Sequence, residues 1–173
     1  MEKIRIGTRG SKLALWQAHY VADKLNENGL QTEIVIIETK GDKILDVSIA
    51  KIGSKGVLAV HSAKDMQSEL PGGFELIAFS EREKVNDVLV SENAAFKLEN
   101  KELVIGTSST RRVATLKRLY PKVRTVAVRG NLQTRIGKMK DGACDALMLA
   151  YAGMNRMGYS DLIGEELDLE QFT

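Results

Sequence analysis

Residues 106–112, Gly-Thr-Ser-Ser-Thr-Arg-Arg, join an apolar strand-like run to an amphipathic helical pattern. Gly106 permits a tight turn, Ser108 or Ser109 can cap the helix, and the unpaired N–H groups of its first turn favour an anion. Arg111 and Arg112 oppose the dipole of that helix, which prefers acidic residues in its first turn. The segment therefore predicts a site for a negatively charged group, although a capped helix with two solvated arginines fits the same residues equally well.

Polar or basic turns also follow most other candidate strands, at residues 8–11, 39–42, 61–65, 129–131 and 150–153. In open α/β sheets, ligands bind beyond the carboxyl ends of the strands, so we expect these turns to meet at one cleft between two lobes. The forked guanidinium of arginine suits carboxylates and phosphates, which predicts a site for a small polyanion. The candidate arginines are Arg9, Arg111, Arg112, Arg129 and Arg135. Asp65 is an acid placed among these bases, and it is a candidate for moving a proton or for holding a ligand cation.

Hydrophobic periodicity predicts the elements that position these residues. It indicates an α/β fold in two lobes, with mostly parallel sheets and helices on both faces. For the first lobe, residues 1–82, we expect a helix closed by Gly29 and strands at 3–6, 33–37, 57–60 and 74–79. The β-branched run 33–37 is typical of a strand covered on both faces.

The second lobe, residues 83–173, shows a cleaner alternation of strand and helix patterns. Strands are predicted at 87–90, 103–105, 123–128 and 146–149, and helices at 109–120, from 131 to a stop at Gly142, and at 152–157. The charged run 81–84 is typical of a linker.

Composition excludes several classes of protein. The chain has 173 residues, 43% of them hydrophobic and 28% charged, as in ordinary globular proteins. A net charge of +2 gives no signature of nucleic-acid binding. Neither a bilayer-length apolar run nor a signal-peptide pattern is present, so we expect a cytoplasmic protein with no membrane partner. One cysteine, Cys144, and two histidines, His19 and His61, make a disulfide or a metal site unexpected.

Six motifs, in order along nearly the whole chain, resemble the porphobilinogen deaminases, also called hydroxymethylbilane synthases. They are Gly-Thr-Arg-Gly-Ser-Lys-Leu-Ala-Leu-Trp-Gln-Ala at 7–18, Lys-Ile-Gly-Ser-Lys-Gly at 51–56, Ala-Val-His-Ser-Ala-Lys-Asp-Met at 59–66, Gly-Thr-Ser-Ser at 106–109 with Arg111 and Arg112, Val-Arg-Gly-Asn at 128–131 with Thr134 and Arg135, and Leu-Ala-Tyr-Ala-Gly at 149–153. The resemblance implies two lobes similar to type II periplasmic binding proteins. It also implies a third domain whose cysteine carries a covalent dipyrromethane cofactor.

The same resemblance implies a transferase of tetrapyrrole and haem biosynthesis, which condenses four porphobilinogen units into hydroxymethylbilane and releases ammonia. Asp65 is then the catalytic carboxylate, with Lys64 beside it. The residues expected to bind cofactor and substrate are Arg9, Ser11, Lys55, Ser62, Thr107, Ser109, Arg111, Arg112, Arg129, Gly130 and Arg135. For Arg129 and Arg135, structural ion pairs between the lobes are an alternative.

The chain is shorter than the family pattern in two places, and it has Gln67 where the family usually has proline. Between Gly56 and Ala59 the family carries a crossover helix, where this sequence has only Val57 and Leu58. A parallel crossover needs about a dozen residues, so we do not expect the standard connection. The chain also ends at Thr173, before the family's return segment and third domain. Because Cys144 does not match the cofactor cysteine, we expect it to be structural, and we expect no covalently bound cofactor on this chain.

These departures predict an inactive fragment or a shortened chain. The family is usually monomeric, whereas exposed sheet edges in a shortened first lobe favour a dimer or strand exchange. The alternative function is a non-catalytic, two-lobed binding module for a small polycarboxylate anion.

Overall fold

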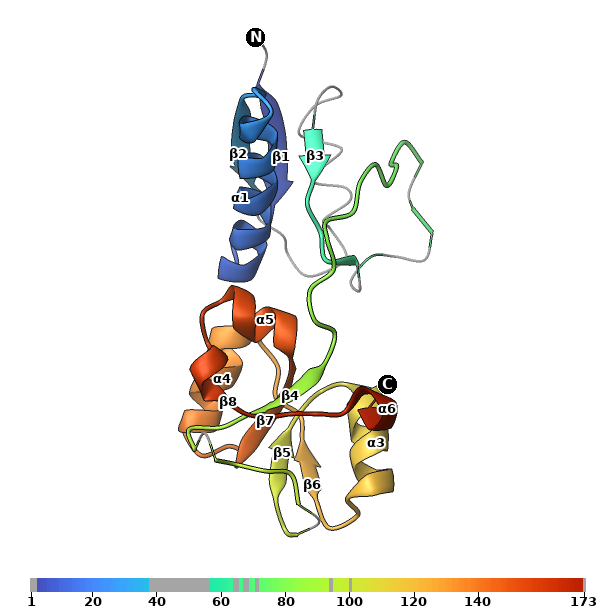
Figure 1. Cartoon of the computed structure of the whole chain (residues 1–173), viewed down its shortest axis with the longest axis vertical. Coiled ribbons are helices and arrows are strands. Elements are labelled where there is room, and N and C mark those ends of the chain that lie inside the picture. Colours follow the sequence, from blue (N-terminus) through green and yellow to red (C-terminus); the bar gives the residue numbers. More distant parts are fainter. Residues whose placement is uncertain are drawn as a thin grey trace. The chain divides into compact units, whose positions relative to one another are not determined.

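The computed structural model describes residues 3–37, 57–63, 66, 69–70, 72–93, 95–99 and 101–172. The chain divides into two units, Met1–Ser80 and Glu81–Thr173 (Figure 1). Each unit has its own sheet. None of the helices in these described ranges is long and apolar enough to cross a membrane.

The first unit is built on β1 (Ile4–Thr8), α1 (Lys12–Glu27), β2 (Thr32–Ile36) and β3 (Val57–Ala59). Its sheet has the order β2-β1-β3, with both pairs parallel. Helix α1 packs on the sheet through small buried residues, Ala18 and Ala22, which contact the fully buried Ile6. Ser11 caps this helix by accepting a hydrogen bond from the Ala14 N–H at 3.3 Å. Gly29 follows the helix with φ 78°, as expected for a glycine stop.

Two expectations for the first unit were wrong. Among the described strands, β2 lies at an edge of its sheet, and Ile36 is 57% exposed, so the strand is not covered on both faces. Residues 74–79 are irregular, with Phe79 73% exposed, because their apolar pattern finds no described strand to pair with. Strand β3 pairs in parallel with β1. Residues 38–56 lie outside the described residues, so the expected lack of the family's standard connection stays a prediction.

The second unit has five strands in the order β6-β5-β7-β4-β8. The strands are β4 (Asp87–Val90), β5 (Val104–Gly106), β6 (Arg124–Val126), β7 (Ala146–Ala150) and β8 (Ile163–Glu166). Strands β5, β6 and β7 are parallel, whereas β4 runs antiparallel to both of its neighbours, β7 and β8. The sheet is therefore mixed, with its parallel part at the β6 side.

Helices cover both faces of this sheet, as predicted. One core contains Leu89 and Met148 from the sheet, together with Leu116 of α3 (Thr110–Leu119) and Phe172 of α6 (Leu169–Phe172). The other core contains the alternate sheet residues, including Val88, Val90 and Leu147, packed against α4 (Leu132–Lys140) and α5 (Tyr151–Arg156). Successive residues of β4 and β7 thus point into opposite cores, which is the period of a strand buried on both faces.

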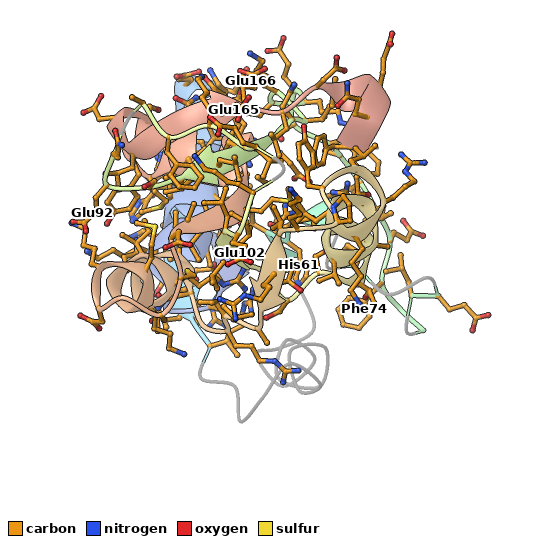
Figure 2. All side chains as sticks on the ribbon, turned by 90° about the horizontal axis from the view of Figure 1, so that it is seen from below. His61, Phe74, Glu92, Glu102, Glu165 and Glu166 are labelled. Carbon is orange, nitrogen blue, oxygen red and sulfur yellow. The ribbon has the colours of Figure 1, made fainter. Side chains whose placement is uncertain are left out.

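The end of the chain contains elements that the sequence did not predict, namely η2 (Ser160–Leu162), β8 and α6. Two side chains of β8, Glu165 and Glu166, which are labelled in Figure 2, bind other segments of the unit. Glu165 Oε2 accepts a hydrogen bond from the Leu98 N–H at 2.6 Å, and Glu166 pairs with Lys84 at 2.6 Å. Strand β8 therefore depends on contacts with distant segments rather than on its own sequence pattern.

Candidate functional site

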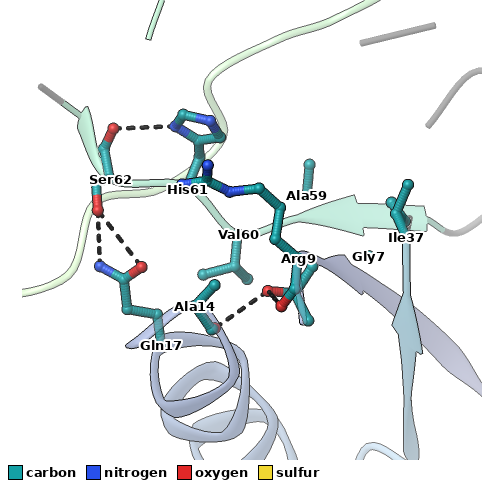
Figure 3. A pocket seen from close by; sticks show the side chains of 10 residues that line it. Gly7, Arg9, Ala14, Gln17, Ile37, Ala59, Val60, His61 and Ser62 are labelled. Atoms are coloured by element: carbon teal, nitrogen blue, oxygen red, sulfur yellow. Dashed lines mark hydrogen bonds between the residues drawn. The ribbon is translucent and has the colours of Figure 1, made fainter. Parts of the chain in front are cut away.

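A small pocket lies at the carboxyl ends of the strands in the first unit (Figure 3). It lies where β1 turns into α1 and where β3 ends, which is the position expected for a ligand in a parallel sheet. Two predicted site residues, Arg9 and Ser62, line it. The full lining is Gly7, Thr8, Arg9, Ala14, Gln17, Ile37, Ala59, Val60, His61 and Ser62.

Gln17 holds the side chain of Ser62. The Gln17 Nε2 donates to Ser62 Oγ at 2.9 Å, and Ser62 Oγ donates to Gln17 Oε1 at 3.4 Å (Figure 3). A residue on α1 therefore orients a hydroxyl that follows β3. Sequence reasoning did not assign Gln17 to the site, although it lies inside the first family motif and one turn after the N-terminus of its helix.

Four other predicted site residues of the first unit are not among the described residues that line this pocket. Ser11 already uses its hydroxyl oxygen as the cap of α1. Lys55, Lys64 and Asp65 lie outside the described residues. The predicted catalytic pair therefore stays a prediction from the sequence.

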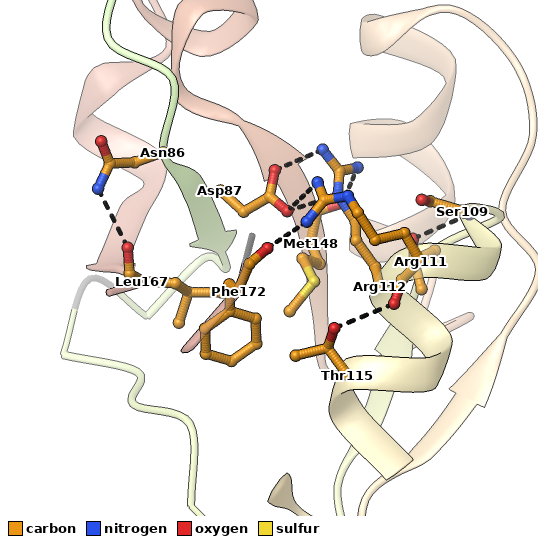
Figure 4. Close-up of polar contacts among 10 residues, drawn as sticks. Asn86, Asp87, Ser109, Arg111, Arg112, Thr115, Met148, Leu167 and Phe172 are labelled. Carbon is orange, nitrogen blue, oxygen red and sulfur yellow. Dashed lines mark hydrogen bonds and ion pairs between the residues drawn. The ribbon is translucent and has the colours of Figure 1, made fainter. Parts of the chain in front are cut away.

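In the second unit, Arg111 and Arg112 both bind the carboxylate of Asp87 (Figure 4). Arg112 makes a two-point contact, with Nη2 to Oδ1 at 2.7 Å and Nε to Oδ2 at 3.0 Å. Its Nη1 donates to the Met148 carbonyl at 3.0 Å. Arg111 donates to Asp87 Oδ2 at 2.8 Å and to the carbonyl of Phe172. The negative group opposite these arginines is thus supplied, at least in part, by the chain itself.

Burial differs sharply within this cluster. The side chain of Asp87 is 5% exposed and that of Arg112 is 13% exposed, whereas that of Arg111 is 51% exposed. A buried carboxylate is tolerated only when it is paired, and here it has two cationic partners. The three groups together carry one net positive charge. Arg111 is the member that solvent, and hence a ligand, reaches most easily.

The turn between β5 and α3 has a different capping arrangement from the one predicted. Ser109 occupies the N-cap position but makes no side-chain capping hydrogen bond with the described residues. Ser108 Oγ donates instead to the Val128 carbonyl at 3.1 Å, and the buried Thr107 Oγ1 accepts from the Ser109 N–H at 3.3 Å. The prediction of a serine side-chain cap was therefore wrong.

The turn after β6 carries Arg129 and Gly130, and Arg135 lies in the first turn of α4, which follows it. Arg135 Nε donates to the Gly130 carbonyl at 2.7 Å, and Lys138 Nζ donates to the Arg129 carbonyl at 3.1 Å. Gly130 has φ 125°, and a Cβ there would lie 2.8 Å from Thr134 side-chain atoms, so the turn requires glycine. Burial and the positive charge of Arg112 lower the pKa of Arg135. The pKa of Arg135 is thus sensitive to the positive charge of Arg112, one of the two arginines that bind Asp87.

Cys144 is buried beneath β5, where a Cβ at Gly106 would lie 2.7 Å from its Sγ. Burial raises the pKa of the Cys144 thiol, which keeps it in the unreactive protonated form. These features fit the structural role expected for this residue.

The N-termini of α3 and α4 allow a matched test of side-chain capping. Asn131→Ala is expected to lower the free energy of unfolding by about 1 kcal/mol, because Asn131 Oδ1 accepts hydrogen bonds from the Thr134 N–H and Oγ1, at 2.9 and 2.8 Å. Ser109→Ala is expected to change it much less, since Ser109 makes no such bond with the described residues. Urea unfolding of both variants measures the difference. Equal losses of stability would show that Ser109 caps α3 in solution.

Solved structures with a similar fold are periplasmic binding proteins. The periplasmic VFT2 domain of BvgS from Bordetella pertussis matches with a TM-score of 0.55 at 14% identity, over 96% of this chain and 76% of that domain. An ancestral cationic amino acid solute binding protein matches with a TM-score of 0.53 at 17% identity, over 96% of this chain and 76% of that one. At such low identity these likenesses establish only the fold, and they confirm the predicted fold class.

Relatives found by sequence share a much higher identity with this chain than these structures do. The porphobilinogen deaminase of Cytophaga hutchinsonii is 58% identical over 185 aligned positions, which cover 98% of this chain and 59% of the relative. That of Desulfosudis oleivorans is 54% identical, over 93% of this chain and 57% of the relative. The first alignment is longer than the 173 residues of this chain, so that relative has residues inside the matched stretch that this chain lacks. This agrees with the shortening expected from the motifs.

The chain thus spans less than two thirds of the length of the curated relatives it matches. A sequence model described as "Porphobilinogen deaminase, dipyromethane cofactor binding domain" matches residues 4–173. The chain therefore belongs to the porphobilinogen deaminase family.

Proposed function

We propose that this chain is the part of a porphobilinogen deaminase that binds the dipyrromethane cofactor and porphobilinogen, in an enzyme that condenses four porphobilinogen units into hydroxymethylbilane. The match of residues 4–173 to the cofactor-binding domain of the family carries the proposal. The resemblance to periplasmic binding proteins concerns the fold alone, so it does not favour a non-catalytic binding module.

The charged residues of the second unit fit ligands with several carboxylates. Both porphobilinogen and dipyrromethane carry acetate and propionate side chains, and guanidinium groups bind carboxylates through paired hydrogen bonds. The half-exposed Arg111, the exposed Arg129 and the partly buried Arg135 supply such groups near strand ends. The residues proposed to hold cofactor and substrate are Arg9, Ser11, Lys55, Ser62, Thr107, Ser109, Arg111, Arg112, Arg129, Gly130 and Arg135.

The bound dipyrromethane supplies the pyrrole to which substrate units are added. The chain's own residues bind the carboxylates, and Asp65 is proposed to stabilise positive charge on pyrrole nitrogens and to assist proton transfer as ammonia leaves. Lys64 is proposed to act beside it. Both roles rest on the family motif at residues 59–66.

A cytoplasmic location is proposed on the basis of the single cysteine, which suits a reducing compartment. Dimerisation or strand exchange through the first unit also stays a prediction. Light scattering across a range of protein concentrations tests it, and a constant monomer mass would contradict it.

The binding part of the proposal is tested by calorimetric titration of the chain with porphobilinogen, after its intact mass has been measured. We expect saturable binding that weakens as salt concentration rises, because the contacts are ionic. An aminomethylpyrrole without the two carboxylates serves as the matched control ligand. Equal binding of both ligands would overturn the assignment of the arginines to substrate carboxylates.

A further inference from the structure

Asp87 is a buried acid that is included in neither the proposed catalytic residues nor the proposed ligand-binding residues. It begins β4, whose other residues, Val88, Leu89 and Val90, are apolar and fully buried. Its backbone is fixed as well, because the Asp87 carbonyl accepts a hydrogen bond from the Leu167 N–H at 2.9 Å. The preceding Asn86 donates to the Leu167 carbonyl at 3.1 Å (Figure 4). The carboxylate therefore projects from a rigid part of the sheet.

We propose that Asp87 is a positioning residue, which orients the guanidinium groups of Arg111 and Arg112 so that Arg111 is held ready for a carboxylate of the ligand. This inference rests on the proposed function of the arginines as carboxylate-binding residues. It assigns Asp87 a role through these arginines and not through contact with the ligand.

The contacts show how the orientation is achieved. Two-point pairing with Asp87 sets the plane of the Arg112 guanidinium, and the Met148 carbonyl fixes its remaining edge. Arg111 is anchored at Asp87 Oδ2 and at the Phe172 carbonyl, while half of its side chain stays exposed. Without the carboxylate, two neighbouring cations would repel each other, and the largely buried Arg112 side chain would lose its counter-charge.

Charge and positioning predict opposite effects on the affinity for an anion. If Asp87 acted only through its charge, removing a negative group near the site would strengthen anion binding. If Asp87 acts by positioning, its removal leaves Arg111 in several orientations, and binding weakens because the guanidinium must be ordered by the ligand. The sign of the change therefore decides between the two roles.

The experiment is a calorimetric titration of Asp87→Asn with porphobilinogen. We expect the Kd to rise about tenfold, since the interactions at stake are charge-assisted hydrogen bonds. Glu166→Gln is the matched control, because it removes a carboxylate from an exposed ion pair with Lys84 in the same unit. Its Kd is expected to stay within about twofold of the unmodified chain, as for a weak surface pair. Unchanged or tighter binding by Asp87→Asn would overturn the proposal.

A double-mutant cycle separates positioning from a general structural defect. Residues that act through a common contact show non-additive effects. In an Arg111→Gln background, Asp87→Asn is expected to raise the Kd by clearly less than about tenfold, because one of the two side chains that it orients is gone. An equal, further tenfold loss in that background would show that Asp87 affects the site in another way.

Two further measurements keep the outcome decisive if Asp87→Asn does not fold. Asp87→Glu keeps the charge but displaces the carboxylate, so positioning predicts weaker porphobilinogen binding and a pure charge role predicts no change. The Nε–H signal of Arg112 in NMR spectra reports the contact without any ligand, and its protection from exchange should fall in Asp87→Glu. Unchanged protection would overturn the positioning role, whereas failure of the unmodified chain to bind porphobilinogen would overturn the proposed function instead.

Discussion

Asp65→Asn is expected to lower porphobilinogen turnover by orders of magnitude while leaving porphobilinogen binding intact or tighter. The asparagine has nearly the same shape but neither the negative charge that stabilises a pyrrole cation nor the ability to exchange a proton. A positioned acid or base contributes about a hundredfold to ten-thousandfold to a rate. Turnover by Asp65→Asn should therefore be lower than that of the unmodified protein by a factor in this range. Porphobilinogen consumption and ammonia release are measured on the protein that carries this chain, with its intact mass known.

A matched carboxylate elsewhere in the chain controls for the loss of charge. Asp161, an exposed acid in η2, has no proposed role, and Asp161→Asn should keep full turnover. Binding and turnover of Asp65→Asn must be measured together. Full turnover by Asp65→Asn would show that Asp65 is not a catalytic residue. A parallel loss of binding and turnover would show that it is a binding residue instead.

Local sequence signals were sufficient to predict the elements whose bounds are set by residues within them or next to them. Helix α4 begins after Asn131, whose side chain caps it, and is followed by Gly142 with φ 84°. Strand β7 is a short run of buried apolar residues, as predicted from its pattern. In these cases the residues that decide the structure lie within the element or next to it.

Elements that depend on distant partners were not predictable in this way. Residues 74–79 have the composition of a strand, but a strand also needs a neighbour for its backbone hydrogen bonds, and they pair with no described strand. Strand β8 shows the reverse case, because Gly164, Glu165 and Glu166 are poor strand formers that pair with β4 nonetheless. Tertiary contacts override local preference at both places.

For the candidate site, the arginines were predictable and their partner was not. Arg111 and Arg112 lie in a turn whose pattern indicates anion binding, whereas Asp87 lies far upstream in the sequence. The one available signal is an acid at the start of an otherwise apolar strand, since a buried charge needs a partner. Gln17 was missed for a similar reason, because its contact with Ser62 joins two distant segments.

Gly106→Ala is expected to lower the free energy of unfolding of the second unit by about 2 kcal/mol, as found for overpacked cores. Gly106 ends β5 and is buried directly before the arginine-bearing turn. A Cβ there would lie 2.7 Å from Cys144 Sγ, 2.7 Å from Leu147 Cδ2 and 2.8 Å from Val128 Cγ2. Because these side chains belong to one buried core, none can move without displacing its neighbours. Urea unfolding followed by circular dichroism measures the loss.

Gly137→Ala is the matched control, and its effect should have the opposite sign. Gly137 lies inside α4, where a Cβ would meet no described atom within 4 Å, so alanine should stabilise the helix by about 0.5–1 kcal/mol. Adding Cys144→Ala to Gly106→Ala removes one of the three close contacts, and the double variant should be more stable than the sum of the single changes predicts. Additive losses would show that Cys144 does not restrict position 106, and a stabilising Gly106→Ala would contradict the packing described for β5.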